Sequence, residues 1–265
     1  MVVRGLRGVS SLAYIVWFCG VGGLLIGSFL NVVIYRVPRG ESIATPCSHC
    51  PHCGHFLKPW ELIPVISYAA LRGRCKQCRT PITRRYAAVE LLTAGLFILV
   101  AMKDLNGPSY RLFLDLLCTS FLIALTFIDL DTFRLPDVLV LPLLGVSLLA
   151  VLIGWGRPGL GEALLSSLGA GGLFFLVAWL YPAGMGLGDA KLVAALGAYL
   201  GFPGIFVAVF LASLAGSVIG VTLTLMKRRG FRQQIPFGPY LAFGALVVLL
   251  WGGDIMALYG STLGR

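Results

Sequence analysis

Two aspartates beside apolar segments are the residues of this chain best suited to chemistry. Asp129 lies at the end of one long apolar run, and Asp189 stands just before another, after a glycine-rich stretch. An ionisable group in or at the edge of hydrocarbon is costly, so it is a functional hypothesis by default. Two carboxyl groups that share one proton supply an acid and a base, as in aspartic proteases. The pair therefore predicts acid–base catalysis on a peptide bond.

Cysteines form a second candidate site. Two Cys-x-x-Cys pairs, Cys50 with Cys53 and Cys75 with Cys78, are separated by the 21 residues 54–74. Two such turns facing each other make a tetrahedral four-thiolate site, which is typical of structural zinc. A metal would supply folding energy that so small a loop lacks. A redox dithiol pair or a disulfide is the alternative, although stable disulfides are rare in a reducing cytoplasm.

The choice of ligands is open at the first pair. Cys47 extends it to three evenly spaced cysteines, and His49, His52 and His55 are interleaved with them. Both thiolate and imidazole bind zinc. Spacing alone does not decide among these side chains.

Composition predicts the elements that must position these residues. Mean hydropathy is +0.90, 58% of residues are hydrophobic and 12% are charged, against about 25% charged in soluble domains. A membrane-spanning helix needs about 20 apolar residues. Eight apolar runs meet or approach this length, with soft edges: 11–35, 86–102, 111–128, 136–155, 163–181, 190–200, 203–226 and 237–258. The sequence predicts an all-α polytopic membrane protein with about eight transmembrane helices and a small cytoplasmic zinc-binding loop domain.

Charge predicts the orientation of these spans. The polar stretch 36–85 holds nine cations and two acidic residues, so it carries +7 of the chain's net +10. Positively charged loops stay in the cytoplasm, and alternation then places 129–135, 182–189 and 227–236 on the same side. Anionic lipid is the expected partner of the basic loop, and nucleic acid is not expected.

Each aspartate also has an ordinary structural explanation. Asp189 suits the N-cap of the helix that follows it, and the glycines before it allow positive φ and close approach of an extended peptide. Asp129 suits an interfacial charge. Asp131 and Asp137 are alternative candidates, but Asp131 is two residues from Asp129 and so points elsewhere on a helix. Asp129 and Asp189 are the predicted catalytic pair, because these two lie at the cytoplasmic membrane boundary beside backbone-breaking motifs.

Several stretches carry a family resemblance along nearly the whole chain. They are 27–38, the two cysteine pairs, 71–75, 81–86 with Glu90, Asp129 with 135–137, 186–191 and 236–240. In these stretches the chain resembles the bacterial type IV prepilin peptidases, or leader peptidase/N-methyltransferases, which share the Gly-x-Gly-Asp motif with other intramembrane aspartic proteases. Cys47 is the visible departure.

The resemblance implies a multi-pass enzyme of the bacterial cell inner membrane. It would cleave the leader of type IV prepilins and type II secretion pseudopilins, and it would N-methylate the new N-terminus with S-adenosylmethionine. Its catalytic residues would be Asp129 and Asp189, and its metal ligands Cys50, Cys53, Cys75 and Cys78. The division expected is a first transmembrane segment at 1–35, a methyltransferase-associated cysteine domain at 36–85 and a peptidase core at 86–265.

Two other functions compete with this interpretation. One is an intramembrane aspartic peptidase without methyltransferase activity, which the long cysteine loop disfavours. The other is a proton-coupled transporter, which would favour internal repeats with carboxylates near the middle of the membrane. The residues that bind S-adenosylmethionine and the oligomeric state are not predicted.

Overall fold

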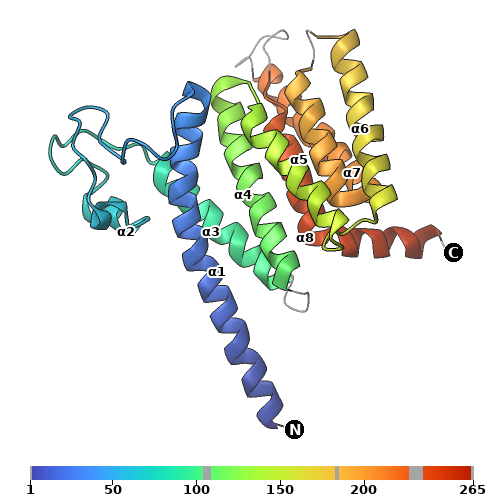
Figure 1. Cartoon of the computed structure of the whole chain (residues 1–265), viewed down its shortest axis with the longest axis horizontal. Coiled ribbons are helices and arrows are strands. Elements are labelled where there is room, and N and C mark those ends of the chain that lie inside the picture. Colours follow the sequence, from blue (N-terminus) through green and yellow to red (C-terminus); the bar gives the residue numbers. More distant parts are fainter. Residues whose placement is uncertain (1, 104–108, 183–184, 227–234, 264–265) are drawn as a thin grey trace. The chain divides into compact units, whose positions relative to one another are not determined.

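The computed structural model describes residues 2–103, 109–182, 185–226 and 235–263 of the chain. Over these ranges the chain is helical, without named strands. Its elements are α1 (Val2–Arg36), η1 (Val37–Arg39), η2 (Pro59–Leu62), α2 (Ile66–Ala70), α3 (Arg85–Lys103), α4 (Ser109–Thr132), α5 (Asp137–Leu152), α6 (Leu160–Leu180), α7 (Leu187–Leu225) and α8 (Gly238–Leu263). Figure 1 shows this order by colour and label.

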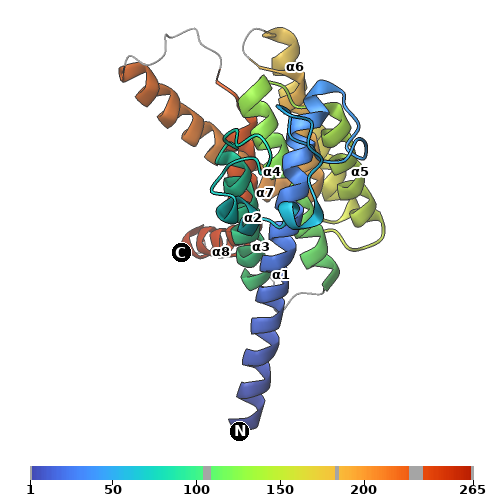
Figure 2. The same cartoon turned by 90° about the vertical axis from the view of Figure 1, so that its left-hand side faces the viewer.

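The helices confirm the predicted membrane class. Within the described ranges, six are long and apolar enough to cross a membrane, and α5 is a shorter apolar helix. Helix α7 contains two of the predicted runs, 190–200 and 203–226. It is broken at Gly201, whose φ of 76° and ψ of −179° are not helical. Figure 2 shows the later half of α7 running in a different direction from its first half. The six long helices, with α7 counted as two halves and α5 added, give about eight spans, as predicted.

The break in α7 has a local cause. Pro203 follows Gly201 by two residues, and proline disfavours a helical conformation in the residue before it while donating no backbone hydrogen bond. Glycine adopts positive φ at little cost. Glu162 on α6 satisfies one freed donor, because its Oε1 accepts a hydrogen bond from the Phe202 N–H at 3.2 Å.

The chain divides into two compact units, residues 1–124 and 125–265, and α4 passes from the first into the second. The functional division at 1–35, 36–85 and 86–265 stays a prediction. In the first unit α1 packs on α3, and Cys19, Phe97 and Ala101 form a buried cluster. The loop between α1 and α3 begins and ends on this pair of packed helices.

The loop between α1 and α3 is fixed to the helices by buried polar groups. Asn31 Nδ2 donates to the Tyr86 carbonyl at 3.0 Å. Arg36 is buried and donates to the carbonyls of Ser42 and Pro46. The Val65 N–H donates to Glu90 Oε2 at 2.8 Å. Such groups are costly to bury without hydrogen bonds, so these contacts define where the loop begins and returns.

In the second unit α7 is the central element. It packs against α5, α6 and α8, and Leu192 and Leu196 on α7 are completely buried with Leu143 of α5 and Leu241 of α8. The loop 227–236, predicted to be basic and cytoplasmic, lies largely outside the described residues. The C-terminal end of α4 and the starts of α5, α7 and α8 carry Asp129, Asp137, Asp189 and Gly238.

Candidate functional site

Asp129 is a buried carboxylate near the end of α4. It lies three residues before the last residue of that helix and is 4% exposed. Its Oδ2 accepts a hydrogen bond from the Gly238 N–H at 2.9 Å. The first N–H groups of a helix have no partner within it, so the start of α8 supplies a donor that fixes this carboxyl group.

Gly238 contacts the carboxylate of Asp129, and sequence reasoning gave it no individual role. A Cβ atom at this position would lie 2.7 Å from Asp129 Oδ2, which is too close for any other residue without displacement. The signals in the sequence were its place at the start of the last apolar run and in the stretch 236–240, which carries part of the family resemblance. The glycine allows the backbone of α8 to approach the carboxylate.

Asp189 occupies the first turn of α7 but is not its N-cap. The N-cap is Gly186, with φ −80° and ψ 143°, and the Asp189 N–H donates to the Gly186 carbonyl. The carboxylate of Asp189 accepts a hydrogen bond from the backbone of Gly186. The N-cap prediction was therefore wrong. Asp189 lies three residues after the N-cap, and its carboxylate accepts the hydrogen bond of the N-cap backbone, as the second residue of a capping box does.

The glycines before Asp189 also differ from expectation. Neither Gly186 nor Gly188 has positive φ. Instead a Cβ at Gly188 would lie 2.9 Å from Leu135 Cβ. Gly184 lies outside the described residues. The glycine at 188 therefore serves close packing of α7 against the turn before α5.

The structure brings the two predicted aspartates together. Asp129 lies within electrostatic range of Asp189, although the two are 60 positions apart in sequence. Two carboxyl groups near each other disfavour ionisation of both at once, which suits a pair that works as acid and base. Asp131 is exposed and Asp129 is buried, so the helix points the two side chains in different directions, as predicted. Both members of the pair lie at helix ends rather than mid-span, which disfavours the transporter interpretation.

An ion pair joins two helix starts beside this pair. Lys191 Nζ contacts both carboxylate oxygens of Asp137, at 2.7 and 2.8 Å. Asp137 is the first residue of α5, and Lys191 lies two residues after Asp189. The contact therefore links the start of α5 to the turn of α7 that carries Asp189.

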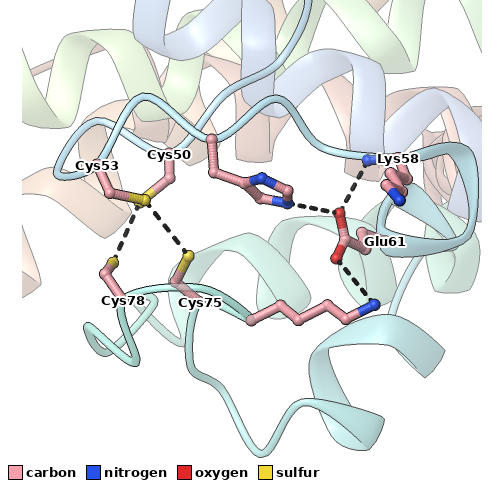
Figure 3. Close-up of polar contacts among 8 residues, drawn as sticks. Cys50, Cys53, Lys58, Glu61, Cys75 and Cys78 are labelled. Carbon is pink, nitrogen blue, oxygen red and sulfur yellow. Dashed lines mark hydrogen bonds and ion pairs between the residues drawn. The ribbon is translucent and has the colours of Figure 1, made fainter.

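The four predicted cysteines form a second cluster, in the first unit. Their sulfur atoms all lie within 4.8 Å of one another. The Sγ atoms of Cys50 and Cys78 are 3.8 Å apart, and those of Cys53 and Cys75 are 4.0 Å apart (Figure 3). Tetrahedral zinc with bonds of about 2.3 Å places its sulfurs about 3.8 Å apart. The residues therefore fit a four-thiolate metal site.

The two cysteine turns have the same backbone hydrogen bonds. The Cys50 N–H donates to the His55 carbonyl, and the Cys50 carbonyl accepts from Gly54. In the second turn Cys75 makes the same two contacts with Thr80 and Arg79. The residue after each second cysteine has positive φ, 70° at Gly54 and 62° at Arg79. Each turn thus presents its two sulfurs in the same local geometry.

Thiol acidity differs strongly within the cluster. Hydrogen bonds from the side chain and the backbone of Thr80 lower the pKa of the Cys78 thiol to about 6. A backbone hydrogen bond from His55 acts to lower the pKa of Cys53, but desolvation and the neighbouring thiols raise it to about 11. One thiol of the cluster is therefore a thiolate at neutral pH. A bound metal cation would favour ionisation of the other thiols as well.

The other candidate ligands lie apart from the cluster. Cys47 is exposed and free and is not grouped with the four sulfurs. The ring of His49 contacts the Cys47 carbonyl and Phe56. His55 Nε2 lies 3.2 Å from Glu61 Oε2. The close-packed sulfurs make the two matched pairs the better ligand set.

Two protein-family models match the chain. Residues 21–103 match the Bacterial Peptidase A24 N-terminal domain, and residues 116–221 match the Type IV leader peptidase family. These ranges contain, respectively, all four clustered cysteines and both aspartates. No solved structure matches the chain.

Characterised relatives are similar over nearly their whole length. A prepilin leader peptidase/N-methyltransferase of Aeromonas hydrophila is 42% identical over 89% of this chain and 90% of its own. Proteins of the same name from Burkholderia pseudomallei and Pseudomonas aeruginosa are 39% and 38% identical, over 92% and 89% of this chain and 88% and 90% of their own. Identity at this level, over this share of the sequence, establishes descent: the chain belongs to the type IV leader peptidase family.

Proposed function

We propose that this protein cleaves the leader from type IV prepilins and type II secretion pseudopilins and then N-methylates the new N-terminal residue. The observation that carries the proposal is the pairing of Asp129 with Asp189 in a chain whose relatives are named prepilin leader peptidase/N-methyltransferase. The lipid bilayer of the bacterial inner membrane is its setting.

The aspartates would act as acid and base. The ionised carboxyl group takes a proton from the attacking water, and the protonated one donates a hydrogen bond to the scissile carbonyl oxygen. The Gly238 N–H holds Asp129, and the first turn of α7 holds Asp189. Both carboxyl groups therefore keep their orientation while the proton moves between them and the substrate.

The cysteine cluster would hold structural zinc through Cys50, Cys53, Cys75 and Cys78. The sulfur separations support this assignment, and zinc would fix the two turns of a loop with little core of its own. S-adenosylmethionine would supply the methyl group.

The test is co-expression of the protein with a prepilin, followed by mass analysis of the pilin N-terminus. The expected product lacks the leader and carries one added methyl group. A trimmed but unmethylated product would support the single-function peptidase. An uncut prepilin, with the enzyme present in the membrane, would contradict the proposal.

A further inference from the structure

Glu61 is a buried carboxylate that lies beside the four-cysteine cluster (Figure 3). It is part of η2, and its side chain is 3% exposed. A carboxylate removed from water is destabilising unless hydrogen bonds and a cation compensate it. The partners of Glu61 therefore indicate which arrangement of the loop its charge favours.

One carboxylate oxygen is bound to the first half of the loop. Glu61 Oε2 accepts a hydrogen bond from the Lys58 N–H at 2.9 Å and lies 3.2 Å from His55 Nε2, which donates when that nitrogen carries the proton. The His55 carbonyl accepts the N–H of Cys50. Through His55, this oxygen is tied to the first cysteine turn.

The other oxygen depends on the second half of the loop. Glu61 Oε1 is buried and has no hydrogen-bond partner among the described residues. The cation near it is Lys76, with Nζ at 3.8 Å. Lys76 lies between Cys75 and Cys78 in the second turn. If that turn moved away, the carboxylate would lose its compensating charge while remaining buried.

We infer that Glu61 is a positioning residue for the metal centre. By bridging His55 and Lys76, Glu61 holds the two cysteine turns at zinc-binding separation. Its contacts favour the arrangement in which the sulfurs of both turns converge. The lowered pKa of Glu61, caused first by the Lys58 backbone hydrogen bond and then by His55 and Lys76, keeps this bridge charged. The inference rests on the proposed zinc site.

The sign of the effect on zinc is informative. Four thiolates around Zn²⁺ carry a net negative charge, so a carboxylate placed near them only by chance would weaken zinc binding by repulsion. A bridging carboxylate strengthens it instead. Replacing residues that orient metal ligands typically weakens metal binding about 10- to 100-fold.

The experiment measures zinc release from the full-length protein in detergent to a chromogenic chelator. Wild-type protein must first show about one zinc per chain, because lack of zinc there would contradict the proposed metal site itself. Glu61→Gln and Lys76→Ala are each expected to release zinc about 10- to 100-fold faster. Matched controls are Glu41→Gln and Lys58→Ala. Glu41 is exposed, and Lys58 uses its backbone N–H, which alanine retains.

A double variant separates charge bridging from general loss of packing. In the Glu61→Gln background, Lys76→Ala is expected to have little further effect, because the partner charge is already gone. If Lys76→Ala speeds zinc release as much in the Glu61→Gln background as in the wild type, so that the two effects add, the inference is overturned. Slower zinc release from Glu61→Gln, or release from both single variants at the wild-type rate, would also overturn it.

Discussion

At the scale of single residues, the catalytic proposal depends on how tightly two carboxyl groups are held. Asp129 is fixed by one backbone donor from α8, and Asp189 by the backbone of the turn that precedes its own helix. Hydrogen bonds to a charged group contribute about 1.5–3 kcal/mol. Disturbing a donor should therefore lower the rate measurably, although by less than removing a carboxyl group.

Gly238→Ala tests this hold on Asp129. The added Cβ would lie 2.7 Å from Asp129 Oδ2, so the carboxylate must move and its hydrogen bond must lengthen. We expect leader cleavage to fall by about 10- to 100-fold, the loss that corresponds to one such hydrogen bond. Gly253→Ala is the matched control on α8, because a Cβ there would meet nothing within 4 Å. Equal activity of the two variants in a cleavage assay would argue against the contact.

The thiols of the cysteine cluster should differ in reactivity once metal is removed. Cys78 and Cys53 are both exposed, but the pKa of Cys78 is about 6 and that of Cys53 about 11. At pH 7 the first is ionised and the second is not. Allowing for the lower nucleophilicity of the more acidic thiolate, alkylation of Cys78 should be on the order of tens of fold faster. Peptide mass mapping after brief alkylation measures this, and equal rates would contradict it.

At the scale of elements, the ends of helices create the candidate active site. The end of α4 and the starts of α7 and α8 meet there, and the contact of Lys191 with Asp137 adds the start of α5. Both side chains are partly exposed, 41% and 54%, so the pair is worth roughly 0.2–1 kcal/mol. Its value lies in fixing the first turn of α7, which carries Asp189.

A charge exchange tests this linkage. Asp137→Lys places two cations in contact and is expected to lower the cleavage rate roughly twofold to fivefold, as expected for a pair of this exposure. The double variant Asp137→Lys with Lys191→Asp restores opposite charges and should recover most of the loss. If the double variant is no more active than either single reversal, the ion pair does not position α7.

Sequence reasoning succeeded for elements and motifs that local pattern determines. Apolar runs predicted the spans, and the repeated Cys-x-x-Cys spacing predicted four sulfurs that converge within 4.8 Å. The break at Gly201 divides α7 at the place where two runs were separated. These features follow from hydrophobicity, metal chemistry and glycine–proline geometry within a few residues.

Features that depend on distant contacts were missed. The donor to Asp129 comes from a residue 109 positions away, and no spacing rule identifies which backbone N–H will face a carboxylate. Asp189 was placed at the N-cap, where Gly186 stands, because the sequence does not show whether a carboxylate caps from the first or the last position of a capping box. Glu61 gave no signal, since its burial results from the folding of both cysteine turns.

At the scale of the whole molecule, the two candidate sites belong to different units. The four cysteines and Glu61 lie within residues 1–124, and both aspartates with Gly238 lie within 125–265. The residues named for each site thus belong to a single unit. Variants of the cysteine cluster and of the aspartate pair should therefore have separable primary effects, on zinc content and on peptide cleavage.

The orientation of the spans is also a property of the whole chain. The nine cations of 36–85 predict that this loop faces the cytoplasm. Relative to a Cys47→Ser parent, in which Cys53 and Cys78 remain exposed, Lys58→Cys should add labelling by an impermeant thiol reagent only from the cytoplasmic side, and Gly159→Cys only from outside. Both positions are exposed. Labelling of Lys58→Cys from outside would invert the topology and place the aspartates on the wrong side for a cytoplasmic leader.

The most direct test of the account is cleavage of a purified prepilin by variants that remove one carboxyl group at a time. Asp129→Asn and Asp189→Asn keep the side-chain shape but cannot take part in the proton transfers, so each is expected to abolish leader cleavage while zinc content stays at the wild-type level. Asp131→Asn, at an exposed position two residues from Asp129, is expected to retain most activity. Cleavage at the wild-type rate by either Asp129→Asn or Asp189→Asn would contradict the catalytic pair.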